Sequence, residues 1–164
     1  MGDLNMYPTR NSLPEHIRAQ SNEILNKHLA AAIDLHAQLK QAHWNVRGPA
    51  FIAIHELFDR ISVEAEAMSD MIAERVSGLG GTARGTIQLA SERSFLAPYL
   101  LGIGSEHEHL TAVAEALATF GTSTRSAIQE AVAFGDADTA DLFTGMSRNI
   151  DKQLWFIESH NVPG

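Results

Sequence analysis

The sequence predicts an all-α protein built as a four-helix bundle. Apolar residues recur at steps of three and four along four long segments, and nowhere do they alternate over the length of a strand. The chain has 164 residues, of which 45% are hydrophobic, so it is long enough to form one domain around a core of its own. The lengths of the connections then decide how the helices are arranged.

The two ends of the chain each contain a pair of long helices. The first predicted helix covers residues 14–46 and the second covers residues 50–79, with the Gly-Pro pair at 48 and 49 as the break between them. A third helix ends near Phe134, and a fourth follows the GDADT segment. Each pair is joined by a short connection, so its two helices are expected to be antiparallel neighbours.

One long connection, residues 80–104, separates the two pairs. Within it, TIQLASER (residues 86–93) is expected to form a short helix of its own. A single crossover of this kind is typical of the ferritin-like four-helix bundle. We therefore expect residues 13–164 to form a ferritin-like bundle domain and residues 1–12 to form an N-terminal extension.

The composition excludes several classes of function. The formal net charge is -8, from 12 Lys and Arg against 20 Asp and Glu, which opposes binding to nucleic acid or to an anionic membrane and attracts cations. The chain has no cysteine, which excludes thiolate metal sites and cysteine nucleophiles. No segment approaches the roughly 20 apolar residues of a membrane span, and MGDLNMYPTR lacks the apolar core of a signal peptide, so we expect a cytoplasmic protein.

The second predicted helix carries a polar stripe opposite its apolar face. At about 100° per residue, the sector nearly opposite the apolar one holds His55, Asp59, Glu66, Asp70 and Glu74. A solvated helix face is the ordinary interpretation of such acidic residues. However, Ile52, Val63 and Ala67 lie in or beside the same sector and make it partly apolar, which is typical of a surface that meets a partner.

The spacing within this stripe predicts metal sites shared between two chains. His55 and Asp59 are one turn apart and can hold one cation, as can Asp70 and Glu74. Asp59 and Asp70, however, lie about 16 Å apart along the helix axis, which is too far for one metal ion. If the helix lies antiparallel against a copy of itself across a two-fold axis, facing residues have numbers with a constant sum. With a sum of 129, Asp59 faces Asp70 and His55 faces Glu74, which creates two shared sites per dimer.

His43 belongs to the same predicted site. It ends the first helix just before the Gly-Pro turn, while His55 lies near the start of the second helix, and a tight turn brings these ends together. Two imidazoles with carboxylates suit Fe(II) with open positions for an oxidant, although zinc or manganese can use the same groups. Each histidine taken alone is more often structural than a ligand, so the prediction depends on the joint spacing.

Together these residues resemble the Dps family, the twelve-subunit mini-ferritins of bacteria and archaea. The run HWNVRGPAFIAIHELFD, followed by DMIAERVSGLGG, is similar to the family's motifs, and the similarity extends from YPTR to DKQLWFIES. The resemblance implies that His43, His55 and Asp59 of one subunit form a ferroxidase centre with Asp70 and Glu74 of its two-fold mate. It also implies that the protein oxidises Fe(II), preferably with hydrogen peroxide, and stores ferric mineral in a hollow dodecamer.

The resemblance has further implications for two other groups of residues. Trp44 follows the first ligand, and in the family a tryptophan there lies close to the centre; a packed interface aromatic is at least as good an interpretation as a redox role. Acidic residues near the start of the last helix line three-fold pores in the family, which here points to Asp136, Asp138 and Asp141. Helix starts also favour acidic residues for capping and through the helix dipole.

A di-iron site within one bundle is an alternative that the sequence does not favour. Glu106 and His109 form an ExxH motif, which di-iron bundles use twice, but no second ExxH occurs in this chain. We therefore expect residues 106–109 to be an exposed helix start favoured by the dipole, with accessory metal binding as a weaker option. Other histidines are assigned to structure or to solvent, namely the inward His28 and His36 and the terminal His16 and His160.

DNA compaction is the alternative function, since some Dps proteins have a lysine-rich terminal tail. Here residues 1–20 hold only Arg10 and Arg18 against Asp3 and Glu15, and NVPG at the other end has no basic residue. Binding to phosphates needs several cations within reach. DNA binding is therefore not expected. A bundle without metal would require five residues of ligand type to be spaced in this way by chance.

Overall fold

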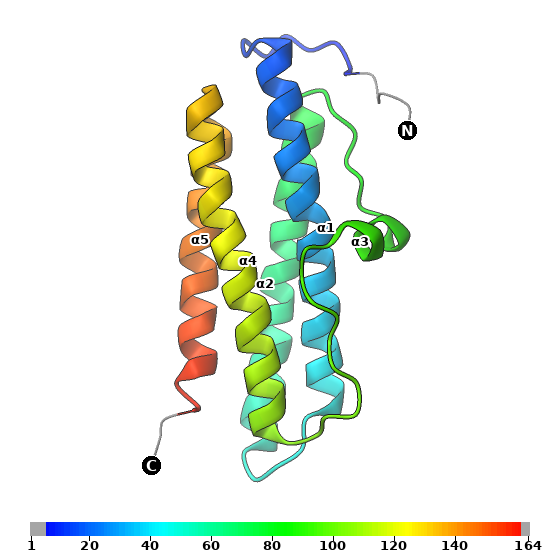
Figure 1. Cartoon of the computed structure of the whole chain (residues 1–164), viewed down its shortest axis with the longest axis vertical. Coiled ribbons are helices and arrows are strands. Elements are labelled where there is room, and N and C mark those ends of the chain that lie inside the picture. The colour runs from blue at the N-terminus through cyan, green and yellow to red at the C-terminus, as the bar shows by residue number, and fades with distance from the viewer. Residues whose placement is uncertain (1–5, 162–164) are drawn as a thin grey trace.

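The computed structural model describes residues 6–161, which form one bundle of helices (Figure 1). The first two helices are each one residue shorter at both ends than predicted, and the predicted extension, residues 1–12, lies partly outside the described residues. The elements in chain order are α1 (Glu15–Asn45), α2 (Phe51–Gly78), α3 (Ile87–Arg93), α4 (Glu106–Phe134) and α5 (Ala137–Glu158).

The chain connects the helices as predicted. α1 and α2 run antiparallel, as do α4 and α5, and the connection between α2 and α4 runs along the bundle with α3 on its way (Figure 1). α1 packs against both α2 and α4, and α5 packs mainly against α4. The α1–α2 turn and the α4–α5 turn therefore lie at opposite ends of the bundle (Figure 1). The predicted four-helix bundle with one long crossover and a short helix within it is confirmed.

The core lies between the four long helices and contains the fully buried Phe58, Phe120 and Phe143. Burying one such side chain contributes roughly 1.5–3 kcal/mol, so the apolar face of α2 decides which side of this helix turns outward. The whole predicted inward face of α2 is buried, namely Ile54, Phe58, Ile61, Ala65, Met68 and Ile72. On the outward face, Ile52 and Val63 are exposed among acidic residues, as the sequence predicted.

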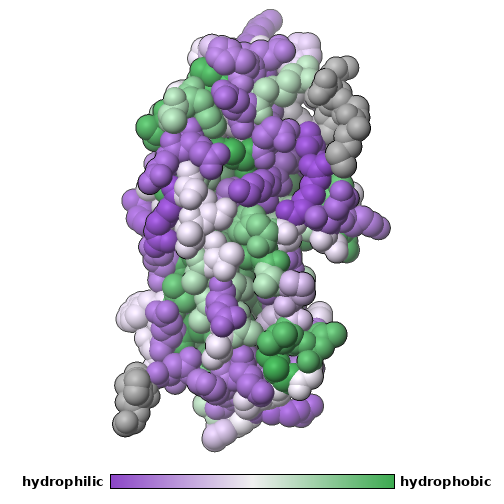
Figure 2. All heavy atoms as spheres, in the orientation of Figure 1, coloured by the Kyte–Doolittle hydropathy of each residue, from purple (hydrophilic) through white to green (hydrophobic). Residues whose placement is uncertain are grey.

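The surface drawn in Figure 2 is a mixture of hydrophilic and apolar regions. An apolar group lies low on this face, on the side of the long connection, and in that connection Leu100 and Leu101 are exposed. Within residues 6–161, no helix combines the length and the apolar character that a membrane crossing requires.

Candidate metal centre

The α1–α2 turn brings two histidines into direct contact. His43 lies in the last turn of α1 and His55 near the start of α2, and their rings stack with centroids 3.7 Å apart. His43 Nδ1 lies 2.8 Å from the carbonyl oxygen of His55, and His55 Nδ1 lies 2.8 Å from the carbonyl oxygen of His43. We call these two mutually bonded residues the reciprocal histidine pair.

These hydrogen bonds determine which ring nitrogen is available to a metal ion. A backbone carbonyl accepts hydrogen bonds but cannot donate, so each Nδ1 must carry the hydrogen. In the neutral imidazole, Nε2 then keeps its lone pair, which is what a metal ion requires. Metal-binding histidines commonly have their other nitrogen bonded to a carbonyl or carboxylate in this way. Both rings of the reciprocal histidine pair are therefore held in the tautomer that suits coordination through Nε2.

Asp59 lies one helical turn beyond His55 and is paired with a lysine of α1. Lys40 Nζ lies 2.6 Å from Asp59 Oδ1 and 5.8 Å from the ring centroid of Trp44, whose side chain is exposed. The hydrogen bond from Lys40, aided by its charge and by the nearby imidazoles, holds the pKa of Asp59 below its usual value. The carboxylate is therefore ionised at neutral pH, and a metal ion that takes up Oδ1 must displace the lysine ammonium.

The other two predicted ligands lie farther along α2. Asp70 and Glu74 are exposed, and the helix rise separates Asp70 from Asp59 by about 16 Å. Within residues 6–161 of a single chain, no three His, Asp or Glu side chains are placed to hold one metal ion. The fold thus brings His43 and His55 together with Asp59 one turn away, and it leaves Asp70 and Glu74 facing solvent.

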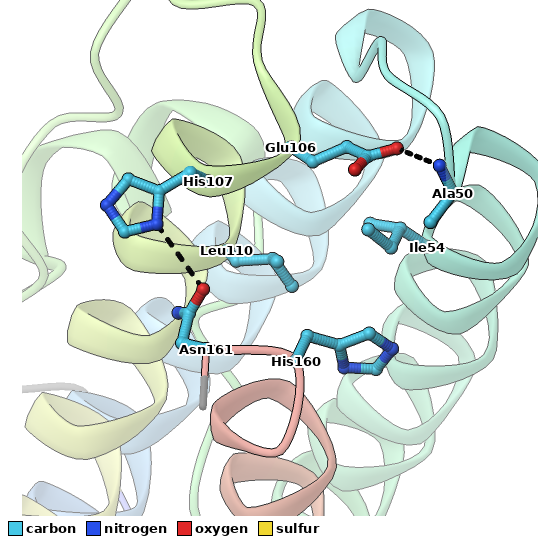
Figure 3. Close-up of a pocket in the computed structure, with 7 residues that line it drawn as sticks. All are labelled: Ala50, Ile54, Glu106, His107, Leu110, His160 and Asn161. Atoms are coloured by element: carbon cyan, nitrogen blue, oxygen red, sulfur yellow. Dashed lines mark hydrogen bonds between the residues drawn. The ribbon is translucent and has the colours of Figure 1, made fainter. Parts of the chain in front are cut away.

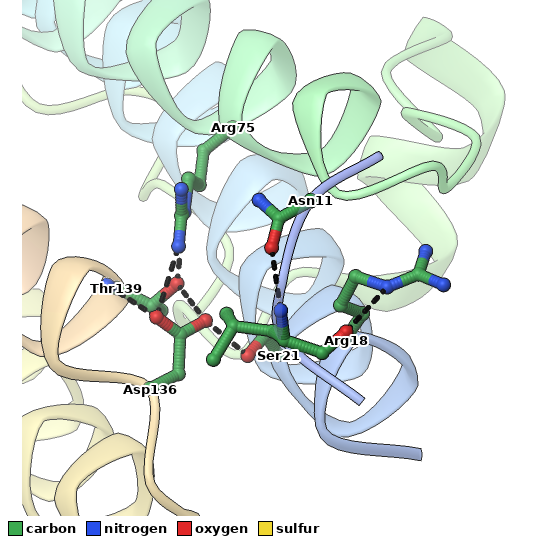
Figure 4. A network of polar contacts seen from close by, with 7 residues as sticks. Asn11, Arg18, Ser21, Arg75, Asp136 and Thr139 are labelled. Atoms are coloured by element: carbon green, nitrogen blue, oxygen red, sulfur yellow. Dashed lines mark hydrogen bonds and ion pairs between the residues drawn. The ribbon is translucent and has the colours of Figure 1, made fainter. Parts of the chain in front are cut away.

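Asp136, one of the three predicted pore residues, lies inside the bundle instead. Its carboxylate accepts hydrogen bonds from Ser21 Oγ at 2.6 Å, Thr139 Oγ1 at 2.6 Å and Arg75 Nη2 at 2.9 Å (Figure 4). Burial alone would raise the pKa of Asp136, but the hydrogen bonds from Ser21 and Thr139 and the charge of Arg75 outweigh burial and lower it. Asp136 caps α5 and ties it to α1 and α2, which contradicts a pore role for its fully buried side chain.

The remaining pore candidates, Asp138 and Asp141, are exposed near the start of α5. The cap explains the difference among the three aspartates. A residue just before a helix turns its side chain back toward the first free backbone N–H groups, whereas residues inside the helix project outward according to the helical period. The pore role of Asp138 and Asp141 stays a prediction.

The ExxH motif differs from the exposed helix start that the sequence predicted. His109 is 1% exposed, and its Nδ1 lies 2.6 Å from the hydroxyl oxygen of Tyr99. Burial lowers the pKa of His109 and raises that of Tyr99. Glu106 is half-buried and accepts a hydrogen bond from the backbone of Ala50 (Figure 3). His107 and Glu108, which lie between them, are exposed. The predicted exposure was therefore wrong for Glu106 and His109 and correct only for His107 and Glu108.

The other histidines lie where the sequence predicted. His28 is buried, with its ring nitrogens 2.7 Å from the Ile24 carbonyl oxygen and 3.0 Å from Ser123 Oγ. Burial lowers the pKa of His28. His36 is half-buried and lies 2.9 Å from the carbonyl oxygen of Ser62. The two terminal histidines, His16 and His160, are exposed.

Sequence reasoning missed the contacts of two residues at this end of the bundle, Lys40 and Glu106. Lys40 lies one turn before Trp44, so the helical period alone could have placed it beside the site. Glu106 had no such signal, because its partner Ala50 is 56 residues away in the chain.

Comparison with known proteins identifies the family. The chain belongs to the ferritin-like family, whose domain model matches residues 22–162. The DNA protection during starvation protein of Agrobacterium fabrum is 43% identical over 157 residues, which cover 96% of this chain and 97% of that protein. DpsC from Streptomyces coelicolor has a TM-score of 0.91 at 30% identity, with 98% of this chain and 93% of that chain covered. DpsA14 from the same organism has a TM-score of 0.89 at 32% identity, with 97% and 94% covered. Within its family, the chain is therefore a Dps protein.

Proposed function

We propose that this protein is a ferroxidase that oxidises Fe(II) at centres shared between two subunits and stores the ferric product. The reciprocal histidine pair carries the proposal, because its hydrogen bonds leave both Nε2 atoms available to a metal ion and His55 lies one helical turn from the ionised Asp59. Imidazole and carboxylate ligands with open positions suit Fe(II), and Zn²⁺ is a competitor for the same set.

The proposed centre joins residues of two copies of the chain. His43, His55 and Asp59 of one subunit face Asp70 and Glu74 of its two-fold mate, which makes two centres per dimer. The exposed, partly apolar outward face of α2 supports such a contact, since apolar side chains on a surface are typical of an interface. The exposed indole of Trp44, next to His43, is assigned to the same interface.

The chemistry consists of electron transfer from iron to the oxidant. Two Fe(II) ions each give one electron to hydrogen peroxide, which takes up two protons and becomes two water molecules. The protein contributes position and charge, because the carboxylates hold the cations and the imidazoles bind through Nε2. Lys40 leaves Asp59 when iron enters, so one cation replaces another at that carboxylate. The ferric product then collects inside a closed shell of twelve subunits, with Asp138 and Asp141 near the entry pores.

Rapid mixing with Fe(II) tests the proposed reaction, and the mass in solution tests the proposed assembly. We expect the absorbance of the ferric product to rise faster with hydrogen peroxide than with oxygen, and preloading with Zn²⁺ to slow the rise, because zinc occupies the same ligands. The mass in solution should correspond to twelve chains of 17.9 kDa. Monomers alone, or oxidation no faster than in buffer, would contradict the proposal.

A nucleoid role is the second candidate, favoured by the name of the relative from Agrobacterium fabrum, which refers to DNA protection. We expect no complex in gel-shift assays at physiological salt and neutral pH, because the chain has a net charge of -8 and few cations near its ends. A lysine-tailed Dps protein serves as the positive control. Tight binding that weakens steeply as salt is raised would instead show that the assembly creates a basic surface.

A further inference from the structure

Glu106 of α4 fastens the turn that carries the two histidines. Ala50, the residue before α2, has no capping side chain of its own, and its backbone N–H donates to Glu106 Oε1 at 2.5 Å (Figure 3). The same turn pairs with the segment that precedes α4. Arg47 N–H donates to the Gly104 carbonyl at 2.9 Å, and Glu106 N–H donates to the Arg47 carbonyl at 3.1 Å. Three hydrogen bonds thus join the turn to the start of α4.

The Glu106 carboxylate also fits closely against the backbone of the turn. A Cβ added at Gly48 would overlap the Glu106 side chain. Gly48 also has a backbone φ of 155°, which residues other than glycine rarely adopt. Glycine at this position therefore allows the carboxylate to reach Ala50. Glu106 lines an open cavity of about 420 Å³ between the starts of α2 and α4 and the end of α5 (Figure 3). A negative charge at the start of α2 is also favoured by the helix dipole.

The turn controls the geometry of the reciprocal histidine pair. Each histidine is hydrogen-bonded to the backbone carbonyl of the other histidine, across the turn. Both hydrogen bonds therefore require a fixed distance between the end of α1 and the start of α2. If that separation changes, both hydrogen bonds weaken and both Nε2 atoms move. A contact that fixes the turn therefore acts on both ligands at once.

We propose that Glu106 is a positioning residue for the metal centre. Its carboxylate holds the backbone at Ala50, and through this backbone it keeps the two imidazoles in the arrangement that binds metal. Glu106 acts from another helix and is itself no ligand. This inference rests on the proposed function, because it assigns Glu106 a role at that centre.

Three variants of the full-length, assembled protein separate positioning from general stability. Glu106→Ala removes the contact, whereas Glu106→Gln keeps an oxygen that accepts the hydrogen bond of Ala50. Glu108→Ala is the matched control, because its carboxylate bonds to Ser105 and Gly104 at the same helix start. Co²⁺, whose visible absorption spectrum reports on its ligands, serves as the metal probe, with His55→Ala as the variant that lacks a ligand.

Glu106→Ala is expected to weaken Co²⁺ binding about 10-fold to 100-fold and to change its spectrum, as loss of a group that orients a ligand commonly does. Glu106→Gln should bind Co²⁺ within about 3-fold of the wild type, and Glu108→Ala should leave its spectrum unchanged, since neither change frees the turn. Without metal, hydrogen exchange of residues 46–54 should accelerate in Glu106→Ala and not in the other two variants.

Different failures have different meanings in this experiment. Wild-type Co²⁺ affinity and spectrum in Glu106→Ala would overturn the positioning role and leave the proposed metal centre standing. Equal losses in Glu106→Ala and Glu108→Ala, or no rescue by Gln, would also overturn it, because they would reflect fraying of α4 or loss of charge. Two other results are no Co²⁺ spectrum in the wild type, or a wild-type spectrum that His55→Ala does not abolish. In either case the proposed centre fails, and the positioning role fails with it. The exchange of residues 46–54 then reports only whether Glu106 fastens the turn.

Discussion

Two inactive variants are expected to regain Fe(II) oxidation when they are unfolded together and reassembled. One variant carries His55→Ala and Asp59→Ala, and the other carries Asp70→Ala and Glu74→Ala. Each should be inactive by itself, because every shared centre of its homo-oligomer lacks two of its five ligands. A mixed dimer has one centre that keeps only His43 and one complete centre. In the complete centre, the second variant supplies His43, His55 and Asp59, and the first variant supplies Asp70 and Glu74.

Activity in the mixture should reach up to about half of the wild-type value per mixed dimer, since one of two centres is complete. Stopped-flow oxidation measures it, and native mass spectrometry shows whether mixed dimers have formed. Each variant unfolded and reassembled alone is the control. If mixed dimers are present and oxidation stays absent, the ligands do not come from two chains, and the shared centre is rejected.

Asp136→Ala is expected to lower the stability of the bundle on the order of 3 kcal/mol. The change removes the cap of α5 and leaves Arg75 and Ser21 without the carboxylate that both contact. A fall in the midpoint of thermal unfolding measures the loss. Asp138→Ala is the matched control, because its side chain is exposed in the first turn of the same helix and should change the midpoint little. Equal effects of the two changes would contradict the buried cap.

The contribution of Asp136 should also depend on pH. Its pKa is lower in the folded chain than in the unfolded chain, so its stabilising effect is complete above the unfolded value of about 4 and is lost as the pH falls through the folded value. The difference in unfolding midpoint between the wild type and Asp136→Asn should therefore be largest at neutral pH and shrink below about pH 4. A difference that does not vary with pH would show that hydrogen-bond geometry, and not charge, provides the stability.

Much of the fold and part of the candidate site could be predicted from sequence, because the relevant signals are local. The helical period decides which side of a helix is apolar, so the inward face of α2 was predicted residue by residue and is buried throughout. The Gly-Pro break likewise predicted that His43 and His55 meet at one turn, which the 3.7 Å separation of their rings confirms. The assignment of Asp70 and Glu74 to a partner chain follows from spacing alone and stays a prediction.

The sequence by itself determined the number, order and inward faces of the helices, because each follows from residues within a few turns of one another. Only the tertiary structure decided the roles of Asp136, His109 and Glu106. Ser21, which bonds to Asp136, is 115 residues away in the chain, and Ala50 is 56 residues from Glu106. An acidic residue at a helix start looks the same in sequence whether it faces solvent or a buried partner. Its surroundings exist only after the helices have packed, and they decide its pKa, its exposure and therefore its role.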